Sequence, residues 1–114
     1  MKFPHIRVHP RVEMAGLVMI HNEERLYIAP LMDLSVGGAF VSQLVTLTPG
    51  SQVKVVLKGP RFATPVQVEG TVVRVEKSAR KGSAVQFQGL TEMAKSAIQS
   101  CVFETRMEAA LKVA

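Results

Sequence analysis

Residues 33–38 of this 114-residue chain read DLSVGG, and they lie between the apolar residues 26–32 and 39–41. On a β-strand, Asp33 and Ser35 share one face and Leu34 points to the other. A plain hairpin would need only an Asn-Gly or Asp-Gly turn. A polar pair placed before two glycines instead indicates a site that grips a ligand where a strand ends.

Composition limits the class of protein. Hydrophobic residues make up 47% of the chain, which is typical of a globular domain with a single modest core. No apolar run approaches the roughly 20 residues of a membrane span, and the first residues lack the apolar region of a signal peptide. The only cysteine is Cys101, so we expect no intrachain disulfide, no zinc site and a cytoplasmic location.

The formal net charge of +5 favours anionic partners, namely phosphate-bearing ligands, nucleic acid or an acidic membrane surface. The basic residues are scattered, and the chain has one tyrosine and no tryptophan. A platform for single-stranded nucleic acid needs aromatic side chains interleaved with basic ones. The composition therefore disfavours a nucleic-acid-binding barrel, which we keep as a third hypothesis.

Hydrophobic alternation predicts several short strands. The first covers residues 12–19, and a phase slip at Gly16 indicates a bulge. Further strand patterns follow over residues 25–35, 39–42, 52–58, 66–76 and 83–87. Five or six strands with short turns between them are typical of a small antiparallel barrel or sandwich.

One helix follows the strands. It begins near Thr91, a suitable N-cap with Glu92 in the first turn. One apolar arc of this helix is expected to cover the open end of the barrel, with Cys101 as an apolar core residue rather than a reactive thiol. The arc consists of Met93, Ala94, Ala97, Ile98, Cys101 and Val102.

Beyond Val102 the apolar residues move to a different helix face, formed by Phe103, Met107, Ala110, Leu111 and Ala114. The barrel cannot bury both faces of a continuous helix. This second stripe therefore predicts contact with another chain, either a second copy through Phe103, Met107 and Leu111 or an output partner. The alternative is a bent or frayed tail that folds back on its own barrel.

The sequence does not indicate an enzyme. The histidines are His5, His9 and His21, and Pro10 disfavours the helix that would bring His5 and His9 together. The chain has no nucleophile elbow, zinc signature or paired catalytic carboxylates. We interpret His9 as a loop side chain rather than a metal ligand or a base.

A second polar constellation lies near the N-terminus, where residues 7–11 read RVHPR. The guanidinium groups of Arg7 and Arg11 can bind phosphate or guanine by paired hydrogen bonds and can stack on a purine. Asp33 could accept hydrogen bonds from guanine, and Ser35 could donate to a phosphate or hold its own loop.

Gly37 and Gly38 are expected to turn with positive φ and to leave bare N–H groups for a ligand. Together with the arginine segment, they predict a guanine-nucleotide clamp. The structural alternative is that these residues are surface charges, a turn-capping pair and simple turn formers. Arg74, on a predicted strand, is a further residue that could face the ligand, although a surface role is the simpler interpretation.

The pair Arg7-x-x-x-Arg11 and Asp33-x-Ser35-x-x-Gly38 resembles the two-part signature of PilZ domains, bacterial receptors for cyclic di-GMP. The resemblance continues in residues 70–74 and 82–87. It implies a six-stranded antiparallel β-barrel with a C-terminal helix, all in one domain over residues 1–114. Residues 1–11 would form an arginine loop over one face, 12–90 the barrel and 91–114 the helix.

The resemblance also implies roles for these residues. Arg7 and Arg11 would contact the guanines and phosphates of a cyclic di-GMP monomer or intercalated dimer. Asp33 and Ser35 would contact guanine and its surroundings, and Gly38 would shape the turn; secondary candidates are Gly37, Arg74 and His9. Many members have two adjacent arginines at the start of the loop, where this chain has Ile6 beside Arg7.

The implied function is that of a receptor without catalytic groups or cofactor, which changes its surface on binding cyclic di-GMP and so regulates a partner protein. The alternative is a PilZ-type adaptor that works through protein contacts with weak or no nucleotide binding.

Overall fold

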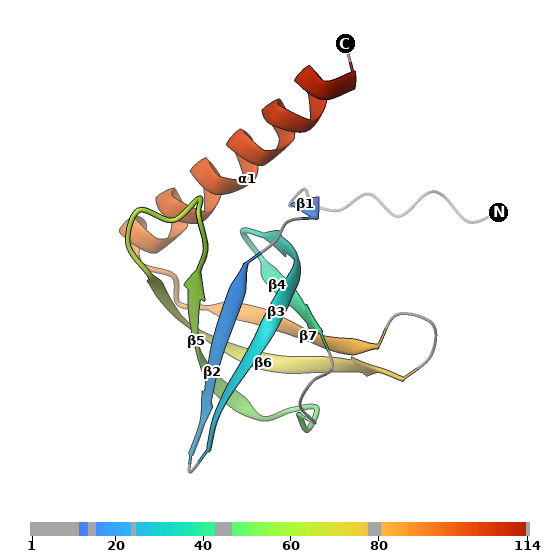
Figure 1. The fold of residues 1–114 in the computed structure, drawn as a ribbon. Coiled ribbons are helices and arrows are strands. Elements are labelled where there is room, and N and C mark those ends of the chain that lie inside the picture. The colour runs from blue at the N-terminus through green and yellow to red at the C-terminus, as the bar shows by residue number, and fades with distance from the viewer. Residues whose placement is uncertain (1–11, 14–15, 24, 43–46, 78–80, 114) are drawn as a thin grey trace, which may run out of the picture.

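The computed structural model describes residues 12–13, 16–23, 25–42, 47–77 and 81–113. These contain seven strands and one helix (Figure 1). The strands are β1 (Val12–Glu13), β2 (Leu17–Asn22), β3 (Arg25–Ser35), β4 (Gly38–Ser42), β5 (Gln52–Lys58), β6 (Val66–Glu76) and β7 (Gly82–Gln88), and the helix is α1 (Glu92–Val113).

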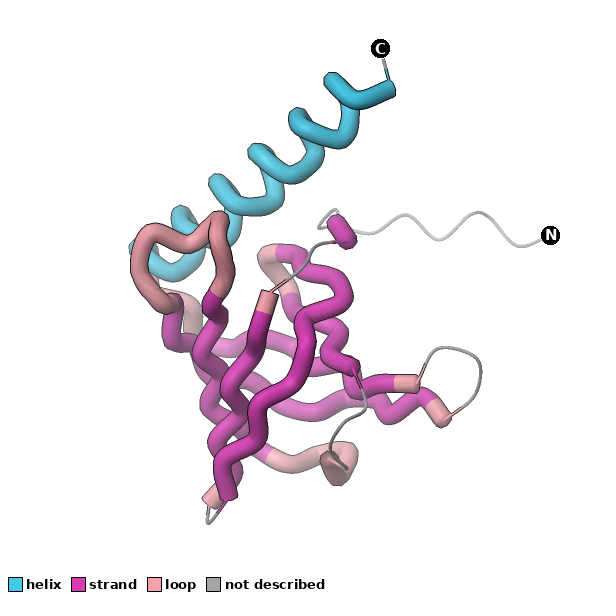
Figure 2. Tube along the Cα trace, in the orientation of Figure 1, coloured by secondary structure: helices cyan, strands magenta, loops and turns pink. Residues whose placement is uncertain are grey.

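All the strand pairs are antiparallel, and the strands form one sheet in the order β1-β3-β2-β5-β6-β7-β4. A further pairing between β3 and β4 closes strands β2 to β7 into a six-stranded barrel, with β1 added to the edge of β3. Helix α1 starts at one end of the barrel and projects beyond it (Figures 1 and 2). This confirms the predicted fold class.

The interior is lined by the inward faces of the strands, because alternate side chains of a strand point to opposite faces. In β5, Val53, Val55 and Leu57 are buried, and they alternate with exposed or half-buried residues. The predicted strands at 25–35, 52–58 and 66–76 have the observed bounds of β3, β5 and β6.

The phase slip at Gly16 corresponds to an extra residue in the chain. Glu13 pairs with Asp33 and Leu17 with Pro30, so three chain positions on one side oppose two on the other. The N–H of Leu31 donates to the carbonyl of Gly16 at 2.9 Å. The single strand predicted over residues 12–19 is therefore two strands, β1 and β2, which both pair with β3. An extra residue of this kind is what a bulge inserts.

The N-cap prediction for the helix is confirmed, since the N–H of Ala94 donates to Oγ1 of Thr91 at 3.1 Å. The buried residues of α1 are Ala94, Ile98, Cys101 and Val102, and Ala97 is half-buried against the same core. The placement of Met93 on this arc was wrong, because its side chain is 85% exposed. At 100° per residue, Met93 lies at the margin of the arc, where the barrel does not reach it.

The second half of α1 is braced by the loop between β5 and β6. Arg61 from this loop forms an ion pair with Glu108, and Lys112 lies 3.5 Å from the same carboxylate. The hydrogen bond from Arg61 lowers the pKa of Glu108, and the same contact raises the pKa of Arg61. Among the described residues, no helix is long and apolar enough to span a membrane.

Candidate ligand-binding site

The DLSVGG segment forms the hairpin between β3 and β4, in which Ser35 pairs with Gly38. The Ser35 hydroxyl accepts hydrogen bonds from the N–H groups of Gly37 and Gly38, each at 3.2 Å. It also donates to the Gly38 carbonyl at 3.4 Å. Of the two roles considered for this hydroxyl, the structure shows the one in which it holds its own loop. The N–H groups expected to be bare for a ligand are thus used within the turn.

The expectation of positive φ at Gly37 and Gly38 was wrong. Among the glycines that the structure describes, φ is positive only at Gly50 and Gly89. A Cβ atom on Gly38 would lie 2.2 Å from the carbonyl oxygen of Val85 in β7. Glycine is required at position 38 because β4 and β7 approach closely there, so the constraint is steric rather than conformational.

The polar pair is buried. Asp33 and Ser35 are each 5% exposed, and Leu34 between them is fully buried in the core. The register of β3 against β4 shifts between Leu31 and Asp33, which marks a bulge at Met32. Because of this extra residue, Leu31 and Leu34 both reach the core although they are three apart, and the side chain of Asp33 is re-aimed to the outer face.

Asp33 belongs to a row of paired residues that crosses five strands. Glu13 pairs with Asp33, Asp33 with Phe40, Phe40 with Ala84, and Ala84 with Arg74. Paired residues in antiparallel strands share a face. The row therefore places Arg74 on the same outer face as Asp33, three strands or about 14 Å away.

Arg74 is a half-exposed residue at the far end of this row. Its side chain is 48% exposed, and Nε lies 2.6 Å from Oε1 of Glu76. Two strands of the row, β4 and β7, contribute Phe40 and Ala84, which are 2% and 6% exposed. The row thus has a buried apolar centre with a carboxylate near one end and a guanidinium at the other.

The arginine segment directly precedes β1 in the sequence. Arg7, His9 and Arg11 lie outside the described residues, but the chain enters the barrel at Val12, which pairs with Leu34. Val12, the first residue that the structure describes, therefore pairs with Leu34, which lies between Asp33 and Ser35.

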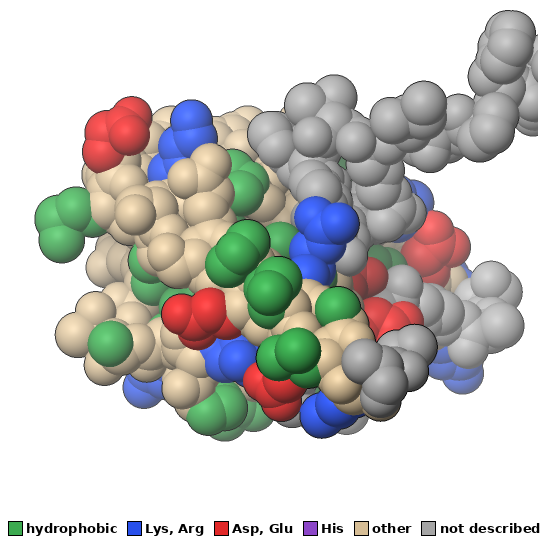
Figure 3. Space-filling model, turned by 90° about the horizontal axis from the view of Figure 1, so that it is seen from above, with side chains coloured by type: hydrophobic (Ala, Val, Ile, Leu, Met, Phe, Trp, Pro, Cys, Tyr) green, Lys and Arg blue, Asp and Glu red, His purple; other side chains and the backbone are tan. Residues whose placement is uncertain are grey.

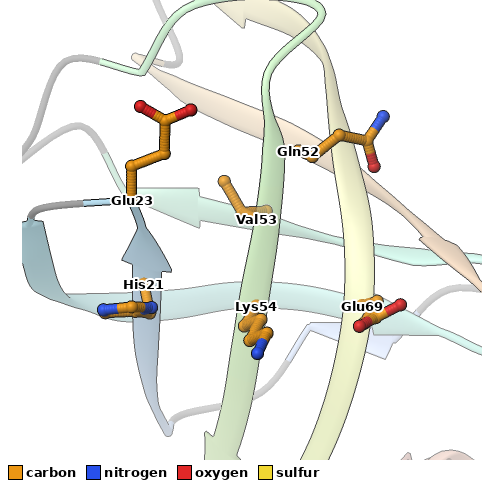
Figure 4. Close-up of a pocket in the computed structure, with 6 residues that line it drawn as sticks. All are labelled: His21, Glu23, Gln52, Val53, Lys54 and Glu69. Atoms are coloured by element: carbon orange, nitrogen blue, oxygen red, sulfur yellow. The ribbon is translucent and has the colours of Figure 1, made fainter.

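A hollow of about 340 Å³ on the outer face of the barrel is lined by His21, Glu23, Gln52, Val53, Lys54 and Glu69 (Figure 4). Lys54 pairs with His21 on one side and with Glu69 on the other. The charges that line this hollow are mixed, and none of the predicted site residues lines it. His21 pairs with Leu26, seven residues or roughly 23 Å along β3 from Asp33.

A second hollow, of about 320 Å³, lies between β1, the loop after β5 and α1. It is lined by Glu13, Pro60, Arg61, Thr105, Glu108, Ala109 and Lys112. Glu13 is the register partner of Asp33, so this hollow adjoins the DLSVGG hairpin. The two cations in its wall already contact Glu108.

Two features of this face were not predicted. One is the bulge at Met32, whose only sequence signal is the odd spacing of Leu31 and Leu34. The other is Thr71, which joins Gln86, Gly38 and Ser35 in the adjacent row. Within the part of the chain that the structure describes, its buried hydroxyl oxygen has no hydrogen-bond partner.

Comparison with protein-family models gives a match to the PilZ domain over residues 5–104. This range includes the arginine segment, the barrel strands and the first half of α1. The chain belongs to the PilZ domain family. No curated protein sequence matches it.

Several solved structures have the same fold at low sequence identity. The PilZ domain of Escherichia coli YcgR with c-di-GMP is 13% identical with a TM-score of 0.72, over 96% of this chain and 98% of that one. The K. pneumonia MrkH complex with c-di-GMP is 16% identical with a TM-score of 0.77, over 96% of this chain and 56% of that one.

The Bacillus subtilis inhibitor of motility MotI/DgrA is 14% identical with a TM-score of 0.75. The match covers 94% of this chain and 54% of that one, so the PilZ chain spans about half the length of MotI/DgrA, as it does of MrkH.

Proposed function

We propose that this PilZ domain is a receptor for cyclic di-GMP, bound on the outer face that carries Asp33. The observation that carries the proposal is the pairing of β1 with β3. Val12, the residue that follows Arg11 in the chain, lies opposite Leu34, which stands between Asp33 and Ser35 of the DLSVGG hairpin. Consecutive Cα atoms are about 3.8 Å apart, so covalent geometry alone keeps Arg11 next to this pairing.

The structural alternative, in which the two half-motifs are unrelated surface features, gives no reason for this proximity. Val12, the residue that directly follows the first motif, pairs with Leu34 inside the second motif, although about twenty residues separate them in the chain. The structures of the YcgR PilZ domain and of MrkH, which have the same fold, are complexes with c-di-GMP.

In this proposal the residues have separate roles. Arg7 and Arg11 bind guanine edges and phosphates, where planar guanidinium groups form charge-assisted paired hydrogen bonds. Asp33 recognises the N–H groups of guanine. Ser35, Gly37 and Gly38 fix the hairpin that holds Asp33 in place, through the two N–H bonds to the Ser35 hydroxyl.

Arg74 is a secondary contact in this proposal. It shares a face and a register row with Asp33, but its guanidinium already contacts Glu76. Its loss is expected to weaken binding less than the loss of Arg11, because the ion pair with Glu76 must be given up on binding. His9, in the middle of the arginine segment, remains a further secondary candidate.

The output is regulation of a partner protein. Binding of the ligand by the arginine segment would change the surface next to β1 and the adjoining hollow. The absence of catalytic groups in the sequence motif fits a receptor or adaptor rather than an enzyme.

The test is isothermal titration with cyclic di-GMP, GTP, cyclic di-AMP and a single-stranded oligonucleotide in parallel. We expect micromolar or tighter binding of cyclic di-GMP only. Arg11→Ala should weaken it by more than about 1.5 kcal/mol, or over tenfold, because a charge-assisted contact is lost. Arg25→Ala is the matched control, since Arg25 is an exposed arginine at the opposite end of β3.

The other outcomes decide between the alternatives. No heat and no shift in melting temperature at ligand excess would overturn the receptor and favour the protein-contact adaptor. Binding of the oligonucleotide alone would favour the nucleic-acid barrel. Equal affinities for wild type and Arg11→Ala would show that the site is elsewhere.

A further inference from the structure

Helix α1 exposes large apolar side chains on the face directed away from the barrel. Met93 is 85% exposed, Phe103 64%, Met107 48% and Leu111 71%. Figure 3 looks down on this helix and shows hydrophobic side chains along it, interspersed with acidic and basic ones. At 100° per residue, Phe103 and Met107 lie roughly opposite the buried Ile98 and Cys101.

The spacing on this outward face follows a heptad. Met93, Ser96, Ser100, Phe103, Met107 and Ala110 are separated by 3, 4, 3, 4 and 3 residues, and all of them are exposed. Alternating steps of three and four residues keep one seam facing another helix in left-handed packing. The element that packs on this seam is therefore expected to be a helix rather than a strand or a loop.

We propose that this seam pairs antiparallel with the same helix of a second copy of the chain. In an antiparallel pair, a positions meet d positions of the other helix. In one register, Met93 lies opposite Ala110, Ser96 opposite Met107, and Ser100 opposite Phe103 of the second copy. Every layer then joins one large and one small residue, and the two-fold axis repeats the three layers.

Parallel pairing gives a poorer fit. It would place Ser96 and Ser100 opposite themselves, leaving two adjacent layers without large side chains, and it would stack Phe103 on Phe103. Voids and overfilled layers both destabilise an interface that must pack as densely as a protein core. The size pattern therefore selects the antiparallel, two-fold symmetric arrangement.

The charges on one flank of the seam fit the same arrangement. An antiparallel two-fold axis brings the same flank of both helices together. Arg106 then lies between Gln99 and Glu92 of the second copy, an amide oxygen and a carboxylate. On the other flank, Glu104 lies between Ala97 and Glu104 of the second copy, with Ala97 the nearer, so this flank adds no charge attraction.

The position of the barrel leaves room for this partner. The buried face of α1 covers the barrel, and the seam runs along the opposite side of a helix of 22 residues, roughly 33 Å long. In the antiparallel pair, the two barrels lie at opposite ends and on opposite sides of the helix pair. The assembly does not depend on cyclic di-GMP.

Disulfide cross-linking tests the orientation. The variant Ser96→Cys with Met107→Cys should form covalent dimers under mild oxidation, because these positions face each other in the proposed register. The two cysteines of one helix are eleven residues or roughly 16 Å apart and cannot bond to each other. Cys101 is 1% exposed and is present in every sample. Ser96→Cys alone should not cross-link, because in this register its partner position is Met107. Cross-linking of Ser96→Cys alone would show parallel pairing and overturn the proposal, as would the absence of cross-links in the double variant.

Mass in solution tests the surface. Wild type should show twice the monomer mass as its concentration rises, and Phe103→Glu with Met107→Glu should remain monomeric. The matched control is Leu26→Glu with Ile28→Glu, which adds the same charges at apolar residues that are 56% and 55% exposed on the barrel. The control should still dimerise. A monomeric wild type at all concentrations, or loss of dimer in both variants, would overturn the proposal.

Discussion

The two halves of strand β3 differ sharply in their surroundings. From Arg25 to Pro30 the strand pairs with β2, and even the large apolar side chains of Leu26 and Ile28 are 56% and 55% exposed. From Leu31 to Ser35 it is flanked by β1 on one edge and β4 on the other. There Leu31, Asp33, Leu34 and Ser35 are all at most 5% exposed.

The difference shows what a buried motif requires. The half from Arg25 to Pro30, the open half, follows the simple alternation of a strand with one solvent-exposed face. The half from Leu31 to Ser35, the closed half, buries both faces and needs a bulge to do so. The candidate ligand-binding residues of β3, Asp33 and Ser35, both lie in the closed half, where their positions are fixed by neighbours on both edges. Pre-positioned polar groups of this kind bind a ligand with little loss of conformational entropy.

The largest expected effect is that of Leu34→Ala in the closed half. Leu34 is fully buried, so the truncation should lower the free energy of unfolding by about 2–5 kcal/mol. Ile28→Ala in the open half is the matched control and should cost only about 0.5 kcal/mol, as is usual at a surface position. Urea denaturation measures both, and equal losses would remove the distinction between the halves.

A smaller loss is expected for Gly38→Ala, which crowds the strand that closes this half of β3. The added Cβ would lie 2.2 Å from the carbonyl oxygen of Val85, so β4 must shift at a cost of about 1–3 kcal/mol. Gly89→Ala is the comparison, since nothing lies within 4 Å there and only the positive φ of 56° opposes the substitution. A Gly38 variant as stable as wild type would contradict the close approach of β4 and β7.

The smallest expected effect is that of Ser35→Ala at the end of the closed half. The N–H groups of Gly37 and Gly38 lose their acceptor, which should cost about 1–2 kcal/mol of stability. Amide hydrogen exchange should rise at these two glycines more than along the rest of β4. Unchanged exchange there would mean that the hydroxyl does not hold the turn.

Much of the fold was predictable because it depends on local periodicity. The strands around Val53 and Val68 alternate with period two, and Thr91 provides a standard N-cap, so these elements appear in the sequence itself. The assignment of Met93 to the buried arc failed because a helical wheel shows which residues share a face but not how far the barrel extends along it.

The candidate site was predictable only in part. The residues of the DLSVGG hairpin do come together, but the reason for Gly38 lies in β7, about fifty residues further along the chain. The burial of Asp33 likewise depends on β1 and β4 as neighbours, which no local pattern records. The roles of Arg7 and Arg11 stay predictions that the titration must test.

Because of the position of Cys101, the reaction rate of the sole thiol in the chain reports how often helix α1 separates from the barrel. The side chain is 1% exposed on the barrel-facing side of α1, and burial raises its pKa, so the reactive thiolate is scarce while the helix is docked. A thiol reagent added to the native protein can reach the sulfur atom only during openings of this interface. Labelling rates would therefore report the free energy of helix docking separately from that of global unfolding, with no probe added to the protein.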